Sequence, residues 1–377
     1  MQRRLISLAL LSALTLSLFA ANAASAAPRP VIIDITNDGD VRAFGPPNDL
    51  TGVTKLSVRG RNLPTGATLR WSIPRTAIGR YTITQTTTAG TSEVTIAGIQ
   101  PGRTDIDFEA VDAKGVVVAS MKLPLSIPQF FTIDDTNPDL DAFMTNNNLV
   151  AIQSQIMNEA RGVVELLHNT NANVRLIWKS QGTSIPAHLP AAFVTTARIG
   201  NTDVNPAGPR YGTSDPGLTS TVVGDTEFDE SILIFPQSYL AAGGATSDVN
   251  TAVNELVRAV NTLQSSDSDY ELWLIRIFGR LIGETLAHEM FHALLPVPFF
   301  HNSDGTGADI ETSDIMDSGS FRSLVERTGI VAVSSLSANL FANLSDLGTG
   351  SINRLSGANL TFVQTHFPVP PVKPFDR

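Results

Sequence analysis

Short stretches in which apolar and polar residues alternate occupy the chain from about residue 31 to residue 127. Alternation with a period of two places successive side chains on opposite faces of a strand, and Gly- or Pro-bearing turns separate the stretches at nearly regular intervals. The stretches are Lys55–Val58, Thr68–Ile73, Tyr81–Thr84, Ser92–Ile96, Asp105–Val111 and Val116–Val118. Roughly seven short strands in about a hundred residues predict an antiparallel β-sandwich.

The pattern changes after Pro128, where apolar residues begin to recur at helical spacing. Leu149–His168 and Val249–Leu263 each carry the apolar stripe of an amphipathic helix. Val174–Trp178 and Ser231–Phe235 are short apolar runs typical of buried strands. The second part of the chain is therefore expected to mix helices and strands.

Two further segments carry local signals. The three asparagines Asn146, Asn147 and Asn148 precede the first of these helices, and we expect them to cap it. Thr195–Thr226 is rich in Gly, Pro, Thr and Asp, which predicts a long polar loop.

The longest helical pattern, from about Asp269 to Leu295, is apolar nearly all round, which is typical of a helix buried within a domain. One polar stripe interrupts it, because every fourth residue along one face is ionisable: Arg276, Arg280, Glu284, His288 and His292. Burying such groups costs several kcal/mol unless they are paired or bound to an ion. We expect Arg280 and Glu284 to pair with each other, and the two histidines to need another partner.

The first 26 residues have the pattern of a secretory signal peptide. Arg3 and Arg4 supply a positive start, Leu5–Ala20 is an apolar run, and small residues lead to a cleavage site that we place after Ala26. The apolar run is too short and too weakly flanked for a lasting membrane span. The sequence therefore predicts export to the cell exterior or the periplasm, with no transmembrane segment after cleavage.

Composition narrows the classes of function. The formal net charge is −10, and lysines and arginines form no cluster, which argues against a nucleic-acid partner. The chain contains no cysteine, which excludes disulfides, thiol nucleophiles and cysteine-based metal sites. For an exported protein, the lack of disulfides favours a bacterial source.

His288, Glu289 and His292 form a His-Glu-x-x-His motif within the polar stripe. Two histidines four residues apart on a helix lie one above the other and can bind a single metal ion. The glutamate after the first histidine can accept a proton from a water molecule that the ion activates. Without an ion, the same two residues could be ordinary buried histidines, so the neighbouring residues decide between the two interpretations.

Residues downstream of the motif favour the metal site. Pro296 and Pro298 end the helix, and His301 follows in a loop, so half of the six histidines lie between residues 288 and 301. Imidazole nitrogens suit zinc, which makes His301 the best candidate for a third ligand. A tight apolar turn centred on Met316 comes next, at Ser313–Gly319.

These residues together resemble the active-site strip of the metzincin zinc metallopeptidases. That family has two helical histidines, a third histidine after a chain reversal, and a methionine turn beneath the metal. The resemblance implies that His288, His292 and His301 bind Zn²⁺, that Glu289 is the general base, and that Met316 forms the floor of the site. The resemblance is close over residues 284–320, and over residues 135–370 it extends only to the order of elements.

The spacing after the second histidine departs from the metzincin pattern. The family's glycine falls at Leu295 and its third histidine at Pro298, whereas His301 comes three residues later. Several oxygen donors therefore stay open as the third ligand, namely Asp304, Asp309, Glu311 and Asp314, or Glu326 if the ligand is a glutamate on a later helix, as in gluzincins. The first four of these and Asp317 could also bind Ca²⁺, although their spacing does not match an Asp-x-Asp-x-Asp-Gly loop.

The chain is therefore expected to comprise a signal peptide at residues 1–26, an all-β sandwich at residues 27–128 and an α+β metzincin-like metallopeptidase domain at residues 129–377. The sandwich resembles the immunoglobulin-like modules of secreted bacterial proteins, and it could be a permanent module or a removable pro-segment. We expect a secreted zinc endopeptidase acting on proteins or peptides. The alternative is a secreted binding or surface protein whose second domain is a degenerate, non-catalytic relative of the peptidases.

Overall fold

A computed structural model describes most of the chain outside its two ends. The described residues are 32–37, 53–72, 81–88, 91–98, 102–169, 172–182, 194–200, 217–219, 231–240, 247–262, 268–294, 314–316, 322–332, 347–352, 354–355 and 357–367. The predicted signal peptide at residues 1–26 lies outside these ranges, and so does the predicted ligand His301.

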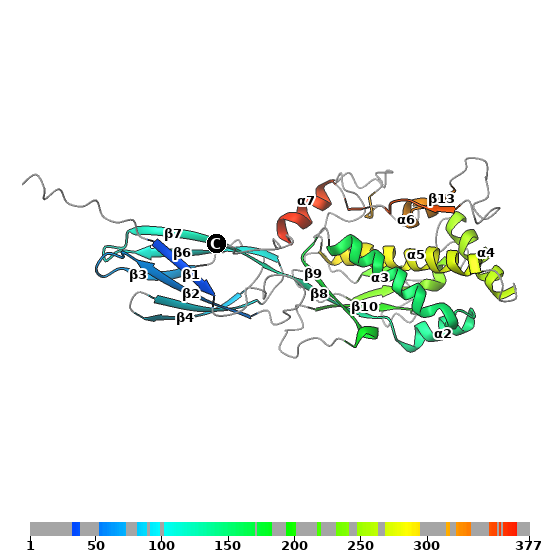
Figure 1. Ribbon diagram of the computed structural model, residues 1–377, viewed down its shortest axis with the longest axis horizontal. Coiled ribbons are helices and arrows are strands. Elements are labelled where there is room, and N and C mark those ends of the chain that lie inside the picture. The colour runs from blue at the N-terminus through cyan, green and yellow to red at the C-terminus, as the bar shows by residue number, and fades with distance from the viewer. Residues whose placement is uncertain are drawn as a thin grey trace, which may run out of the picture.

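Before Pro128 the described residues form two antiparallel sheets (Figure 1). The first, in the order β1-β2-β5-β4, contains β1 (Ile32–Asn37), β2 (Val53–Arg61), β5 (Thr91–Gly98) and β4 (Tyr81–Thr88). The second, in the order β3-β6-β7, contains β3 (Thr68–Ser72), β6 (Gly102–Val111) and β7 (Val117–Ile127). Every strand expected from the alternating pattern is present, and the assignment to an immunoglobulin-like sandwich stays a prediction.

Side chains of the second sheet alternate between a buried and an exposed face. In β3 the burial alternates residue by residue, with Leu69 and Trp71 inside. The ring of Trp71 meets the fully buried ring of Phe108 edge to face, with centroids 4.7 Å apart. The period of two read from the sequence is therefore the period of burial.

A five-stranded sheet follows, in the order β11-β12-β10-β8-β9. Its strands are β8 (Gln129–Asp134), β9 (Val174–Trp178), β10 (Val194–Ile199), β11 (Gly217–Thr219) and β12 (Ser231–Ile234). All neighbouring pairs are parallel except β11 with β12, so the antiparallel strand lies at one edge. Only Pro128 separates β7 from β8, which leads the chain directly from one sheet into the other.

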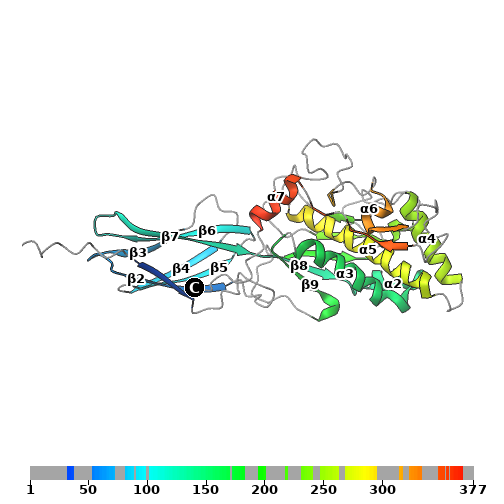
Figure 2. The same cartoon turned by 45° about the horizontal axis from the view of Figure 1, so that its top comes forward.

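Two long helices, α3 (Gln153–Asn169) and α5 (Ser268–Leu294), lie side by side against this sheet (Figure 2). Among the described residues, the other helices and strands are α2 (Pro138–Asn146), η2 (Val150–Ile152), η3 (Lys179–Gln181), η5 (Pro236–Tyr239), α4 (Ser247–Thr262), α6 (Leu324–Thr328), β13 (Ile330–Ala332), β14 (Leu347–Thr349) and α7 (Gly357–His366). Among these, α4 and α6 contact α5 directly, so α5 is enclosed by other elements.

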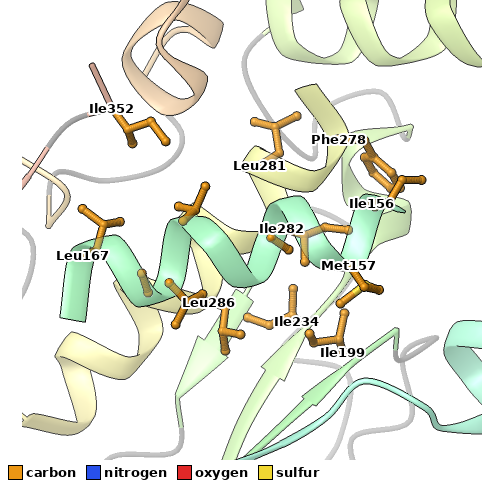
Figure 3. Packing of buried hydrophobic residues seen from close by; sticks show 14 of the residues in the cluster. Ile156, Met157, Leu167, Ile199, Ile234, Phe278, Leu281, Ile282, Leu286 and Ile352 are labelled. Atoms are coloured by element: carbon orange, nitrogen blue, oxygen red, sulfur yellow. The ribbon is translucent and has the colours of Figure 1, made fainter. Parts of the chain in front are cut away.

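The largest apolar core fills the space between α3, α5 and the five-stranded sheet. Figure 3 shows Ile156 of α3 with Ile282 and Leu286 of α5, beside Ile199 and Ile234 of the sheet. All five of these side chains are fully buried or nearly so. Their helical spacing and strand alternation are the patterns that the sequence displays.

Two glycines of α5 allow α3 to approach closely. A Cβ atom at Gly279 would lie 2.7 Å from the carbonyl oxygen of Ile156, and one at Gly283 would overlap the backbone of Ala160. Because the two glycines are four residues apart, they lie on the same face of α5, and their nearest neighbours show that this face meets α3. The distance between α5 and α3, and with it the position of the polar stripe of α5, therefore depends on these two glycines.

The expected asparagine cap is wrong. Asn137 caps α2, a helix that the sequence pattern did not reveal, and its side chain accepts bonds from the first backbone N–H groups. Asn147 instead ends α2, and Asn148 adopts the left-handed conformation, with φ of 55°. Asparagine suits both helix ends, so a run of three does not indicate which end it occupies.

The long polar loop expected at Thr195–Thr226 is also partly wrong. Its first residues belong to β10, which lies inside the sheet between β8 and β12 and buries Ala197 and Ile199. A second part, Gly217–Thr219, forms the edge strand β11. The small and polar residues of β10 concealed an alternation that is only six residues long.

Within the described ranges, no helix is both long enough and apolar enough to cross a membrane.

Candidate metal centre

The His-Glu-x-x-His motif lies in the last turns of α5 and faces the interior. His288, Glu289 and His292 are exposed by only 6%, 7% and 7%. One ligand atom from each of these three residues lies within 4.8 Å of the others. Among the described residues, this is the one group of three that could hold a metal ion, and the zinc site itself stays a prediction.

The two imidazole rings are arranged edge to face, with centroids 4.6 Å apart and planes inclined by 88°. Their Nε2 atoms are 3.0 Å apart. A tetrahedral zinc ion with ordinary Zn–N bonds would hold two such nitrogens about 3.3 Å apart. Without an ion, the same separation allows one ring to donate an N–H to the other. The distance suits both arrangements, so it does not choose between them.

The other nitrogen of His288 provides a sharper indication. Its Nδ1 lies 2.6 Å from the backbone carbonyl oxygen of Ile315, to which it donates a hydrogen bond. In the neutral ring this places the proton on Nδ1 and leaves the lone pair of Nε2 directed at His292. Metal-binding histidines characteristically donate their second N–H to a carbonyl or carboxylate in this way.

Met316 follows the carbonyl that His288 contacts, and its side chain is fully buried. The turn is held by two further bonds, in which Asp314 Oδ1 accepts from the N–H of Met316 at 2.8 Å and Arg354 O accepts from the N–H of Ile315 at 3.1 Å. The predicted methionine turn therefore adjoins the first histidine of the motif.

The expected pair between Arg280 and Glu284 is wrong, because both residues find partners on other elements. Arg280 donates to the Glu159 carboxylate and to the carbonyl oxygen of Thr328, each at 2.7 Å. Glu284 is fully buried and bonds two arginines beyond the methionine turn. A pair along one exposed helix face contributes only a few tenths of a kcal/mol, whereas buried charges must be neutralised by whatever partner the fold supplies.

Arg327 and Arg322 are the two partners of Glu284. Arg327 Nε and Nη2 lie 3.0 and 2.9 Å from Glu284 Oε2, and Arg322 Nη1 donates to Oε1. Burial lowers the pKa of Arg322, and the neighbouring carboxylate partly offsets this. Burial alone would also lower the pKa of Arg327, but the charge of Glu284 raises it above its ordinary value. The carboxylate of Glu284 thus favours the charged form of both arginines.

Hydroxyl groups complete this cluster. Arg327 Nη2 donates to Thr285 Oγ1 at 2.5 Å and to Tyr239 Oη at 3.3 Å. Tyr239 Oη donates to the carbonyl oxygen of Leu281 at 3.0 Å, and its burial raises the pKa of the phenol. We call Glu284, Arg322, Arg327, Tyr239 and Thr285 the buried ion network. The sequence pointed to Glu284 alone, since nothing in the local pattern marks the other four.

His168, to which the sequence assigns no function, lies behind the motif. It is fully buried at the end of α3, and its Nε2 donates to the carbonyl oxygen of Ala287 at 3.2 Å. Its ring stacks on Phe291 at 4.2 Å between centroids. Burial lowers the pKa of His168 to about 4, so the ring is neutral near pH 7. His168 thus contacts the backbone of Ala287, which precedes His288, and the side chain of Phe291, which precedes His292.

The candidates for a third ligand are only partly described. His301, Asp304, Asp309, Glu311 and Asp317, named above as ligands for zinc or calcium, lie outside the described residues, and their roles stay predictions. Glu326 does not join the motif, because its carboxylate accepts bonds from the N–H and hydroxyl of Ser323 at 2.7 and 2.8 Å and so caps α6. Asp314 is buried and shapes the methionine turn.

Comparisons with known proteins add little to this geometry. No family model matches the chain, and no curated protein matches it. Two solved structures of the ZP1 ZP-N1 domain homodimer, from work on the cross-linking of egg coat filaments, each align with 26% of this chain and with 98% or 92% of their own, at 14% or 17% identity. Their TM-score of 0.16 is too low to support any statement about fold or function.

Proposed function

We propose that residues 129–377 are a metzincin-like zinc peptidase domain that hydrolyses peptide bonds in proteins or peptides. In this proposal, the leader at residues 1–26 exports the protein and residues 27–128 are a permanent immunoglobulin-like module. The observation that carries the proposal is the orientation of His288, whose Nδ1 donates to Ile315 O while its Nε2 lies 3.0 Å from that of His292. The bond of Nδ1 to a carbonyl oxygen is characteristic of metal-binding histidines, and the separation of the Nε2 atoms is compatible with an ion.

The donor set fits zinc. Two neutral imidazoles, with His301 as the proposed third ligand, match the nitrogen-rich sites in which zinc keeps an open position. When bound, the ion supplies positive charge that polarises the substrate carbonyl and makes water more acidic. Ca²⁺ prefers oxygen ligands, so this pair of nitrogens does not suit it.

Glu289 moves the proton. One of its carboxylate oxygens lies within 4.8 Å of a nitrogen of each motif histidine, so a water molecule held by these groups would be within its reach. Glu289 accepts a proton from that water as the oxygen attacks the peptide carbonyl, and then passes the proton to the departing amine nitrogen. Because Glu289 is only 7% exposed, bulk water competes little for this proton.

Replacing Glu289 by alanine tests the role of the carboxylate. We expect a loss of about 10²- to 10⁴-fold in the cleavage of fluorescently labelled casein, the range that a general base typically contributes, with zinc still bound at one ion per chain. Glu271→Ala removes an exposed carboxylate from the first turn of the same helix and serves as the matched control. Equal cleavage by the two variants would overturn the assignment of Glu289.

A secreted binding or surface protein is the second candidate. In this candidate no ion is bound, and His292 and His288 share a proton across the 3.0 Å between their Nε2 atoms. Elemental analysis of the purified protein separates the two functions. A chain that carries no zinc after refolding with excess zinc, and that cleaves neither casein nor peptides, would overturn the peptidase and leave the binding protein as the candidate.

A further inference from the structure

Three successive residues of the polar stripe contact three points of the chain, one within the methionine turn and two beyond it. From the N-terminal to the C-terminal end of α5, the contacts are Arg280 with Thr328 O at 2.7 Å, Glu284 with Arg327 Nη2 at 2.9 Å, and His288 with Ile315 O at 2.6 Å. Along α5 the contacts run from residue 280 to residue 288, whereas their partners run in the reverse order, from residue 328 to residue 315. Residues 314–316 and 322–328 therefore lie antiparallel to the stripe, and α6 lies beside α5 in Figure 2.

Glu284 is the central contact and the one with most partners. Its two carboxylate oxygens bond different arginines, Oε1 with Arg322 and Oε2 with Arg327. All three side chains are at most 4% exposed. A guanidinium group donates to a carboxylate in few orientations. These bonds therefore restrict how residues 322–328 can lie along α5 far more than apolar contacts would.

Stability alone does not account for such a cluster. Replacing a buried ion pair by apolar residues of similar volume is often neutral or stabilising, so burial of charge here points to geometry rather than to added stability. What the geometry serves is visible one turn further along α5, where His288 must meet the carbonyl of Ile315 with its Nδ1. A hydrogen bond from the second nitrogen of a ligating histidine sets the tautomer and the direction of the ring.

We propose that Glu284, together with Arg322 and Arg327, is a positioning group for the metal centre. It fixes residues 314–316 along α5, so that Ile315 O meets His288 Nδ1 and directs Nε2 toward the ion site. Glu284 itself touches neither the ion nor the substrate. The zinc-binding consequence rests on the proposed function, whereas the positioning of residues 314–316 does not.

The first measurement is zinc affinity, determined by competition with a chromophoric chelator. Glu284→Gln keeps the size of the side chain and removes its charge. We expect zinc to bind up to about 10- to 100-fold more weakly, the range for losing the hydrogen-bond partner of a ligating histidine, because the bond of His288 to Ile315 O should loosen. Leu274→Ala, a fully buried position on α5 outside the buried ion network, is the control. Both variants should melt at lower temperature, but only Glu284→Gln should lose affinity. Wild-type affinity in Glu284→Gln would overturn the proposal.

Amide hydrogen exchange in the zinc-free protein supplies a readout that does not depend on metal. The N–H groups of Ile315 and Met316 are bonded to Arg354 O and Asp314 Oδ1, and we expect both to exchange at least about tenfold faster in Glu284→Gln than in Leu274→Ala. Equal exchange in the two variants would overturn the positioning role. Failure of the wild-type protein to bind zinc would overturn the proposed function, and exchange would then decide the positioning role alone.

A milder variant covers the case in which Glu284→Gln does not fold. Tyr239→Phe removes the hydroxyl that contacts Arg327 and leaves the charges in place. We expect the same two changes at smaller size, with zinc bound a few-fold more weakly and the amide of Ile315 exchanging faster. If neither changes in a folded Tyr239→Phe protein while Glu284→Gln fails to fold, the network is structural only and the proposal is wrong.

Discussion

The Nδ1 atom of His288 lies 2.6 Å from the carbonyl oxygen of Ile315, 27 residues further along the chain. This bond connects the helix that carries the motif to the turn that carries Met316. The residues between them include the proposed third ligand, His301. A hydrogen bond that closes this part of the chain limits where a loop ligand can lie, so it shapes the site as well as orienting one ring.

Zinc should stabilise the protein if the motif binds it. At a free zinc concentration one hundred times the dissociation constant, linkage predicts a gain of about 2.7 kcal/mol, which calorimetry would show as a higher melting temperature. His292→Ala should abolish the gain, whereas Glu289→Ala should retain it, since the carboxylate is not a proposed ligand. An equal gain in His292→Ala and in the wild type would place the ion elsewhere.

His168 should make the protein sensitive to acid. Burial lowers its pKa from 6.5 to about 4, so the folded state binds the proton less tightly than the unfolded state. The stabilisation is complete above pH 6.5 and is lost as the pH falls towards 4, by about 3 kcal/mol in all. The free energy of unfolding measured by urea between pH 7 and pH 4 should show this decline.

His168→Gln is the matched variant for this measurement. Its amide can still donate to the carbonyl oxygen of Ala287, but it has no proton to gain over this range. Both proteins share every other side chain, so the difference between the two curves isolates His168. Curves that stay parallel from pH 7 to pH 4 would mean that His168 is not the group responsible.

The sequence predicted single elements better than their partners. Ser268–Leu294 forms the motif helix within a residue of the expected bounds, and Val174–Trp178 forms β9 as expected, because apolar periodicity reports burial directly. Partner choice is a tertiary property, and the pairing of Glu284 with Arg322 and Arg327 joins residues 38 and 43 positions apart. No pattern within one helix contains that information.

The candidate site divides in the same way. His288, Glu289 and His292 could be grouped from sequence because four-residue spacing on a helix fixes their relation. The contact of His288 with Ile315, by contrast, depends on how a distant turn packs. His168 carried no signal, because its burial depends on α5 lying over the end of α3, which the local pattern does not contain.

Gly283 should tolerate no side chain. Its added Cβ would overlap the backbone of Ala160, so Gly283→Ala must move α5 away from α3. We expect a loss of about 1–3 kcal/mol in the free energy of unfolding, the usual range for overpacking. Gly162→Ala is the control, because that glycine is exposed on α3 with open space around its Cβ position. It should stabilise the protein by about 0.5–1 kcal/mol through helix propensity. Similar changes in both variants would show that the helices do not pack this closely.

Variants of the buried ion network should change the stability of the protein and the position of residues 314–316 independently. Arg327→Met alone leaves the Glu284 carboxylate buried without its fork, and breaking a buried pair in this way typically costs about 3–5 kcal/mol. Changing Glu284 to Leu and both arginines, Arg322 and Arg327, to Met removes every charge of the cluster, so most of that loss should be recovered.

Zinc affinity should not follow stability in this series. Apolar side chains can fill the same volume, but they do not prescribe how residues 314–316 lie along α5, so the contact of Ile315 with His288 should loosen in the triple variant. We therefore expect near wild-type denaturant midpoints together with zinc binding weakened to the level of Glu284→Gln. A triple variant that recovers both stability and affinity would show that packing alone places the turn, and that the charges serve no positioning role.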